Sequence, residues 1–368
     1  MPTSKNLVLI TGATGHVGST TLLHLLRAGY NVRAAVRTES KAAAIRSRPH
    51  IQRLNPGSRL TFTCVPDITA PGAYDDAIEG VTHVVHIASP LVTGDMVPLS
   101  QHDAYFIQPA VRGTLNMLEA ANRAGTVRRV VMTSSIVALI PCDEMEGAAR
   151  RDPSRPISPN DRVPFVEGPY HSEFAAYAAS KVAALAQAET WMARERPAFD
   201  VVYLHPSFVL GRNDAATTPA QAMKGTNAVV LAMLLGKRFG PYAGASVHVD
   251  DVARVHVAAL EPTVLGNQSY ILSQSAVWND AKTIAHKSFP EARLIVNGGN
   301  VDSTSLPIDA SLTEDTFGFE HISFEQQVHD LVGQFLELRI KQKAVSSSKA
   351  QAATAGRGEM MRKVSALG

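Results

Sequence analysis

The sequence predicts an α/β fold with a doubly wound parallel sheet and a smaller C-terminal lobe. Short apolar runs alternate with helical patterns through the first two hundred residues, which is typical of βαβ units. The glycine-rich stretch TGATGHVGS at 11–19 directly follows the first apolar run, as in sheets of the Rossmann type. After residue 206 the pattern is less regular and rich in turn residues, which indicates a separate lobe.

The first unit shows how each element is assigned. LVLIT at 7–11 is a short apolar run bounded by glycine, which favours a buried strand. The helix expected at 19–28 has four leucines on its inward side and ends before Gly29, a residue type common just after helix ends. The same criteria give further strands at 31–37, 60–65, 83–88, 129–134 and 200–206, and helices near 72–79, 102–125, 172–195 and 227–236.

These elements divide the chain into three parts. The last helix is expected to begin at Ser323. Beyond it, residues 343–368 are rich in Ser, Ala and Gly and have little to bury, so we expect a disordered tail. The expected parts are a dinucleotide-binding domain at 1–206 with a return segment at 246–262, a substrate lobe at 207–245 and 263–342, and the tail.

Composition excludes several classes of protein. The 368 residues are 45% hydrophobic and 18% charged with a formal net charge of +2, so neither global disorder nor a basic nucleic-acid-binding stripe is indicated. Cys64 and Cys142 are too few for a disulfide framework and match no metal-site spacing. We interpret them as reduced core thiols and expect no metal. Without a membrane-spanning run or a signal peptide, we expect a cytoplasmic monomer or homodimer with a small-molecule partner, no nucleic acid and no membrane.

The loop at 11–19 is a candidate cofactor site. Its glycines are spaced GxxGxxG rather than GxGxxG, but the physical requirements are shared. Glycine permits a tight turn and close backbone approach, and the following helix presents free N–H groups to a pyrophosphate. A plain strand-to-helix turn is the alternative, yet the position after the first strand favours a dinucleotide. The loop residues expected to bind it are Thr11, Gly12, Gly15, His16, Val17 and Gly18.

The end of the second strand indicates which dinucleotide binds. NAD-specific sites place Asp or Glu there for the ribose 2′-hydroxyl, whereas Arg accommodates a 2′-phosphate. The stretch VRAAVRTESK holds Arg33, Arg37 and Lys41 and no acidic residue before Glu39. Arg37 and Lys41 form a candidate two-cation clamp, so we expect NADPH rather than NADH. The alternative is a solvated basic strand end.

The helical stretch EFAAYAASKVAALA at 173–186 holds candidate catalytic residues. Tyr177 and Lys181 are four residues apart, so they share a helical face and the ammonium can sit near the phenol. A phenol has a pKa of about 10, and a neighbouring cation lowers that pKa toward working pH. The spacing alone also fits a core tyrosine beside a solvated lysine.

Several stretches together carry a family resemblance. They are TGATGHVGS, VRAAVR, Asp67-Ile68, HIASP (86–90), VVMTSS (130–135), YAASK (177–181), HPSFVLG (205–211) and HVDDVARVHVAALE (248–261). The chain resembles the extended short-chain dehydrogenases/reductases, and within them the branch of dihydroflavonol reductases, cinnamoyl-CoA reductases and fungal carbonyl reductases. The resemblance covers about residues 5–341, and the combination of YAASK, the serine pair and the glycine loop is highly specific.

This resemblance implies roles for individual residues. Tyr177 would be the catalytic acid, Lys181 its cationic neighbour and Ser135 the hydroxyl that orients the substrate carbonyl, with Ser134 as the second candidate. Tyr177 and Ser135 would hydrogen-bond the developing oxyanion during hydride transfer, and Lys181 would also hold the nicotinamide ribose. Further cofactor contacts, each of which also fits sheet packing or a turn, are Asp67, Ile68, Ala88, Ser89, Pro206 and Ser207.

The implied function is NADPH-dependent reduction of a small or medium, largely apolar ketone or aldehyde to the alcohol. Two alternatives stay open: a sugar-nucleotide epimerase or dehydratase with bound NAD, and a non-catalytic dinucleotide sensor. The chain departs from the family pattern at His205, where many relatives have Arg or Asn, and it lacks the acidic-Trp segment often found before the tyrosine. The substrate therefore stays unidentified. His86, His248 and His256 fall in strand or helix patterns, and we interpret them as structural.

Overall fold

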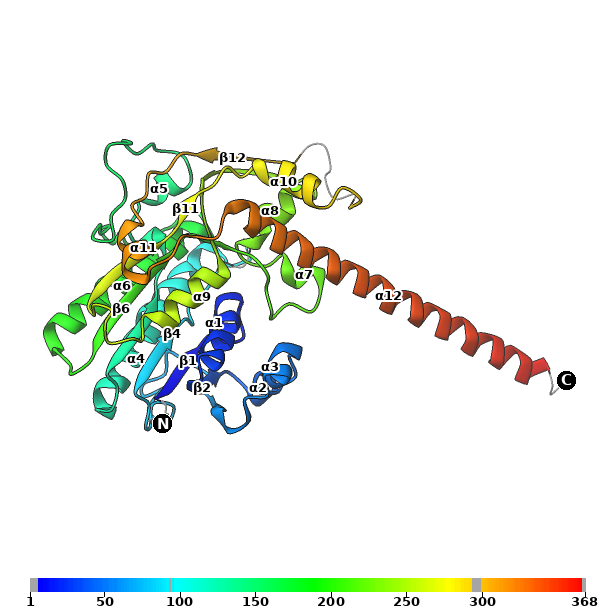
Figure 1. The fold of residues 1–368 in the computed structure, drawn as a ribbon, viewed down its shortest axis with the longest axis horizontal. Helices are drawn as coiled ribbons and strands as arrows, with labels where there is room; N and C mark the ends of the chain where they lie inside the picture. Colours follow the sequence, from blue (N-terminus) through cyan, green and yellow to red (C-terminus); the bar gives the residue numbers. More distant parts are fainter. Residues whose placement is uncertain (1–5, 93, 95, 293–298, 366–368) are drawn as a thin grey trace.

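A parallel sheet lies at the centre of the molecule (Figure 1). A computed structural model describes residues 6–365 apart from 93, 95 and 293–298, and within them seven strands pair in the order β10-β6-β5-β4-β1-β2-β3. The chain order reverses between β1 and β4, which is the switch point where doubly wound sheets bind ligands. The predicted fold class is confirmed. The strands are β1 Leu7–Thr11, β2 Asn31–Val36, β3 Leu60–Cys64, β4 His83–His86, β5 Arg129–Thr133, β6 Asp200–Pro206 and β10 Gln268–Leu272.

Helices cover both faces of this sheet. α1 packs beside α9 on one face, and α4 packs beside α6 on the other. Successive strand residues point to opposite faces. Val8 and Ile10 therefore belong to the hydrophobic core on the α1 and α9 side, while Leu9 belongs to the core on the α4 and α6 side. Burial on both faces explains why β1 is a continuous apolar run, whereas β2 and the edge strand β3 are less buried and carry polar residues. These helices are α1 His16–Arg27, α9 Val249–Ala258, α4 Gln108–Ala124 and α6 Glu173–Glu195.

The smaller lobe is built around two small sheets. One has the order β11-β9-β7, and in the other β8 pairs with β12. Its strands are β7 Phe208–Leu210, β8 Arg238–Ala243, β9 Ala245–His248, β11 Gln274–Ser275 and β12 Asn300–Thr304. The other α-helices among the described residues are α2 Glu39–Arg46, α3 Pro49–Leu54, α5 Cys142–Met145, α7 Pro219–Ala222, α8 Asn227–Leu234, α10 Asp280–Ser288, α11 Ser311–Phe317 and α12 Phe324–Ser365.

The chain returns to the main sheet through α9 and then through β10. We placed β10 in the lobe from the sequence, but it pairs with β6 and completes the main sheet. Arg129 on β5 fixes the connection before β10, because it donates to the carbonyl oxygens of Glu261 at 2.6 Å and Val264 at 2.8 Å. This pairing depends on contacts far apart in the sequence, which a local pattern does not report.

Two interpretations of the N-terminal half are wrong. Residues 72–79 form consecutive turns rather than a helix, and Arg33 donates to the carbonyl oxygens of Ala77 at 2.8 Å and Glu79 at 2.7 Å. Arg33 thus donates to carbonyl groups that, in a helix, would accept hydrogen bonds from the helix's own backbone N–H groups. Cys64 is exposed rather than in the core, since it ends the edge strand β3.

The last helix, α12, is longer than predicted. Ser323 caps it, accepting a hydrogen bond from the backbone N–H of Gln326 at 3.3 Å. The helix runs to Ser365 instead of ending near Lys343, and its C-terminal part projects away from the body in Figure 1. Residues 366–368 of the expected tail lie outside the described residues. No helix in the described chain, α12 included, combines the length and apolarity that a membrane span requires.

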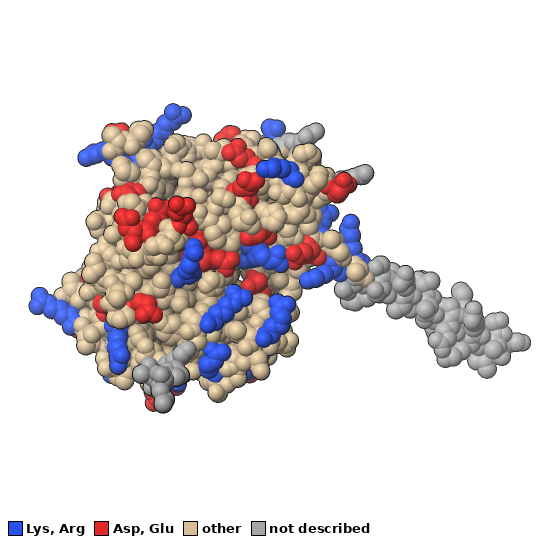
Figure 2. Space-filling view, in the orientation of Figure 1, with Lys and Arg blue, Asp and Glu red and all other residues tan. Residues whose placement is uncertain are grey.

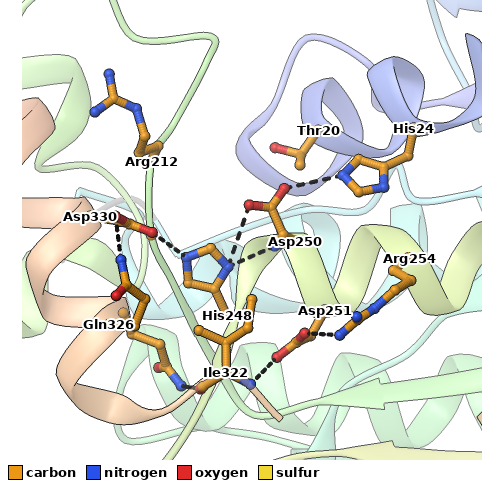
Figure 3. Close-up of polar contacts among 12 residues, drawn as sticks. Thr20, His24, Arg212, His248, Asp250, Asp251, Arg254, Ile322, Gln326 and Asp330 are labelled. Carbon is orange, nitrogen blue, oxygen red and sulfur yellow. Dashed lines mark hydrogen bonds and ion pairs between the residues drawn. The ribbon is translucent and has the colours of Figure 1, made fainter. Parts of the chain in front are cut away.

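A histidine–carboxylate network joins α12 to the main sheet's helices (Figure 3). Nδ1 of the buried His248 accepts the backbone N–H of Asp250 at 3.1 Å, which leaves Nε2 as the donor nitrogen of the ring. That nitrogen lies 3.3 Å from a carboxylate oxygen of Asp330 on α12. The Asp250 carboxylate lies 3.1 Å from Nε2 of His24 on α1. The surroundings of His248 are those of a structural histidine.

Truncation after Ala344 is expected to shift Tm by less than about 2 °C. Among the side chains of α12 that the structure describes, the buried apolar ones are Val328, Leu331, Val332, Phe335 and Leu338, and this truncation leaves all of them in place. Truncation after Val332, which removes Phe335 and Leu338, is the matched control and should lower Tm by several degrees. Thermal melting checks both variants. If truncation after Ala344 lowered Tm by several degrees, residues 345–368 would stabilise the fold.

Candidate active site

The glycine loop connects β1 to α1 in a conformation that requires glycine. Gly12 has a φ of +76°, and a Cβ on Gly18 would lie 2.1 Å from the carbonyl oxygen of Gly12. Gly15 is the N-cap of α1 without a side-chain cap, and the first turn of the helix has no acidic residue. The N–H groups and the positive end of the helix dipole are therefore open to an anion. The loop fits the pyrophosphate of a dinucleotide.

Thr11 joins β1 to β4 at the switch point. Its Oγ1 accepts the backbone N–H groups of Ile87 and Ala88, both at 3.0 Å. With both lone pairs used, its hydroxyl proton is directed to Nδ1 of His86, also at 3.0 Å. Burial, helped by the charge of Lys181, lowers the pKa of His86 to about 4. The ring is therefore neutral, and it holds the strand ends together.

Tyr177 lies close to both Ser135 and Lys181. Ser172 caps α6, accepting the backbone N–H of Ala175 at 3.0 Å, and this sets where the helix begins. Lys181 Nζ lies 5.7 Å from the centre of the Tyr177 ring. Burial raises the pKa of Tyr177, against the opposing effect of a hydrogen bond with Ser135. Burial lowers the pKa of Lys181 to about 8, so at neutral pH a protonated phenol lies beside an ammonium.

The two neighbouring serines have different surroundings. Ser134 Oγ is buried and has no hydrogen-bond partner among the described residues. It lines a cavity of about 20 Å³ together with His86, Ser89 and Lys181, which is room for one water molecule. Ser135 instead hydrogen-bonds Tyr177. This difference favours Ser135 over Ser134 as the hydroxyl that works with the tyrosine.

The other predicted cofactor contacts follow strands of the main sheet. Ala88 and Ser89 follow β4 and line the same cavity as Lys181. Pro206 ends β6, and the backbone N–H of Ser207 donates to the carbonyl of Leu272 at 3.0 Å. The carboxyl ends of parallel strands form one edge, so these residues share the edge that bears the glycine loop.

Asp67 and Ile68 have structural partners of their own. An oxygen of the Asp67 carboxylate accepts hydrogen bonds from the backbone N–H and the hydroxyl of Thr69, at 2.8 Å and 2.7 Å. These bonds lower the pKa of the Asp67 carboxyl. The side chain of Ile68 covers Gly113 on α4, where a Cβ would meet it at 2.9 Å. Their contact with an adenine stays a prediction.

Cations gather beside the cofactor loop. Arg37 follows β2 and Lys41 lies in the first turn of α2, both exposed. Arg48, which we did not identify from the sequence, donates to the carbonyl oxygens of Ala13 at 3.1 Å and Thr14 at 3.4 Å. Figure 2 shows Lys and Arg side chains over the surface that α1, α2 and α3 form. The site therefore suits a cofactor that carries extra negative charge.

His16 ties the glycine loop to the lobe. Burial lowers its pKa to about 4, and the neutral ring donates from Nε2 to the carbonyl of Arg212 at 3.1 Å. Arg212 pairs with Glu337 on α12 at 2.8 Å and 3.0 Å. The side chain of His16 thus contacts the lobe, while its backbone stays at the N-terminus of α1.

Comparison with known proteins identifies the family. The model of the NAD dependent epimerase/dehydratase family matches residues 8–272. Ketoreductase CTB6 of Cercospora beticola is 41% identical, covering 94% of this chain and 99% of the relative. A putative NADPH-dependent methylglyoxal reductase of Candida albicans, GRP2, is 26% identical, covering 90% and 99%. Yeast methylglyoxal/isovaleraldehyde reductase Gre2, solved in complex with NADPH, shares the fold with a TM-score of 0.78 at 21% identity, covering 90% and 99%. The resemblance to extended short-chain dehydrogenases/reductases is confirmed, and the chain belongs to the NAD-dependent epimerase/dehydratase family.

Proposed function

We propose that this chain is an NADPH-dependent carbonyl reductase that converts a small or medium, largely apolar ketone or aldehyde to the alcohol. The observation that carries the proposal is the convergence of Ser135, Tyr177 and Lys181 at the edge of the sheet that bears the glycine loop. The names of the Cercospora and Candida relatives support carbonyl reduction, and the second also supports NADPH. The cytoplasm stays the expected compartment.

The proposed mechanism assigns proton transfer to Tyr177. When NADPH is bound, its nicotinamide supplies a hydride to the carbonyl carbon. The phenol of Tyr177 and the hydroxyl of Ser135 hydrogen-bond the carbonyl oxygen as its negative charge grows. Tyr177 then gives its proton to that oxygen, and the ammonium of Lys181 stabilises the phenolate. Because burial raises the pKa of Tyr177, the phenol holds the proton that reduction consumes.

Arg37→Ala is expected to lower NADPH affinity about tenfold or more while leaving NADH affinity nearly unchanged. A charge-assisted hydrogen bond to a 2′-phosphate is worth about 1.5–3 kcal/mol, and NADH lacks that phosphate. Titration of both cofactors by fluorescence measures the two dissociation constants. Arg33→Ala is the matched control, since Arg33 is engaged with the carbonyl groups of Ala77 and Glu79. Equal losses for both cofactors in Arg37→Ala would make Arg37 structural.

Cofactor analysis and a carbonyl panel together test the proposed function. The purified chain is expected to oxidise added NADPH, followed at 340 nm, with at least one apolar ketone or aldehyde of a panel graded by size. Denaturing the protein before any addition releases cofactor that is held tightly. Release of stoichiometric NAD, together with no NADPH turnover on the panel, would favour the epimerase or dehydratase instead. Cofactor binding without turnover in either assay would favour the dinucleotide sensor.

A further inference from the structure

His205 lies next to Ser135 in the core, near the carboxyl end of β6. It is fully buried. Its Nδ1 lies 3.3 Å from the carbonyl oxygen of Ser135, and its Nε2 lies 3.0 Å from Oγ of Ser269 on β10. No step of the proposed reaction uses this ring. Its role therefore has to come from its contacts.

Arg162 fixes the direction of each hydrogen bond at this ring. A guanidinium only donates, and Arg162 Nη2 donates to Ser269 Oγ at 3.1 Å, so the hydroxyl proton of Ser269 is free for Nε2 of His205. A carbonyl oxygen only accepts, so Nδ1 must carry the ring proton and donate it to Ser135. Burial lowers the pKa of His205 to about 3, which keeps the ring neutral. Glu189 on α6 holds Arg162 in place at 2.6 Å.

The hydrogen bond from His205 reaches the backbone at Ser135, just beyond the last residue of β5 that pairs with β6. The N–H of Ser134 donates to the carbonyl of Leu204 at 2.8 Å, which extends the pairing of β5 with β6 by one residue. One residue further along the chain, the carbonyl oxygen of Ser135 accepts two hydrogen bonds: from the N–H of Ala138 at 3.0 Å and from the Nδ1–H of His205. These two donors together fix the peptide plane that contains the Ser135 carbonyl group. The plane in turn sets the direction of the serine side chain toward the catalytic tyrosine.

We propose that His205 is a positioning residue, which as its Nδ1–H tautomer fixes the Ser135 backbone and thereby the hydroxyl that orients the substrate carbonyl. This inference rests on the role of Ser135 in the proposed function. A small displacement of a catalytic group is enough to slow chemistry. The loss of the bond therefore affects kcat and leaves cofactor affinity unchanged.

A pair of variants and a double-mutant cycle test this role. His205→Leu removes the donor and is expected to lower kcat about tenfold or more, whereas His205→Asn keeps an N–H near the Nδ1 position and stays within about threefold of wild type. NADPH affinity should stay within about twofold in both. In a Ser135→Ala background, His205→Leu should lower kcat less than about twofold, because the group it positions is already absent. Equal losses in both backgrounds, or equal losses in the Leu and Asn variants, would overturn the proposal.

The tautomer can be measured on the wild-type chain, even where His205→Leu fails to fold. Nitrogen NMR of a histidine-labelled sample, assigned by comparison with His205→Asn or with Ser269→Ala, is expected to show the proton of His205 on Nδ1. A proton on Nε2 would overturn the proposal. Wild-type kcat in Ser135→Ala alone would instead overturn the use of Ser135 in the proposed function, a result that does not depend on the tautomer.

Discussion

Replacing Tyr177 by phenylalanine is expected to lower kcat for carbonyl reduction by about 10²–10⁴-fold, the usual contribution of a general acid. The change removes the proton donor and keeps the ring, so packing and NADPH binding should be nearly unaffected. Only the transition state loses an interaction, and kcat and kcat/KM should therefore fall together. Steady-state kinetics with the best carbonyl substrate and fluorescence titration of NADPH measure the two effects separately.

Tyr170→Phe is the matched control for this variant. Tyr170 packs in the same apolar cluster as Tyr177, but its hydroxyl donates to the carbonyl of Val166 at 3.2 Å. The same chemical change there should leave kcat within about twofold. If Tyr177→Phe kept more than a tenth of wild-type kcat, Tyr177 would not be the proton donor.

Lys181→Met is expected to lower kcat about a hundredfold, comparable with the loss of one oxyanion-hole donor. The variant should also change the pH profile. Burial lowers the pKa of Lys181 to about 8, so the wild-type ammonium is charged below that pH and loses its proton above it. The kcat/KM of the wild type should accordingly fall about tenfold per pH unit above pH 8. Because the pKa of Tyr177 is raised, this first alkaline limb belongs to the lysine.

The alkaline limb near pH 8 should therefore disappear in Lys181→Met, while the lower rate persists across the range. Lys224→Met, at an exposed position, is the control and should keep both the rate and the limb. Profiles from pH 6 to 10 in a constant-ionic-strength buffer provide the measurement. An unchanged limb in Lys181→Met would assign it to another group and remove the argument for a catalytic ammonium.

The strands and the loop of the dinucleotide-binding half were predictable because their signals are local. Each of these signals lies within a short stretch of consecutive residues: the apolar runs, the glycine spacing and the four-residue step from Tyr177 to Lys181. The turns at 72–79 were missed because a distant side chain, Arg33, supplies the donors for their carbonyl groups. β10 was assigned to the wrong part because only its partner β6 reveals the pairing.

The same distinction applies to the candidate site. The family resemblance implied a role for Ser135, with Ser134 as the second candidate, but the surroundings that separate the two serines are tertiary. Arg48 had no sequence signal, since its contact with the glycine loop depends on how the chain between α2 and α3 folds back. His205 was recognised only as a departure from the family pattern. The tautomer of its ring follows from Arg162 and Ser269, neither of which is near it in the sequence.

The late arrival of β10 has a consequence for how the protein is made. Until Leu272 has left the ribosome, β6 lies at the edge of an incomplete sheet, with its backbone groups unpaired along one side. An open strand edge is a template for pairing with another chain, so nascent and partly folded forms are prone to aggregate at this position. A fragment that ended at residue 206 would carry this open edge permanently. We therefore expect soluble expression to require the chain through β10, although every residue of the proposed proton-transfer site lies before it.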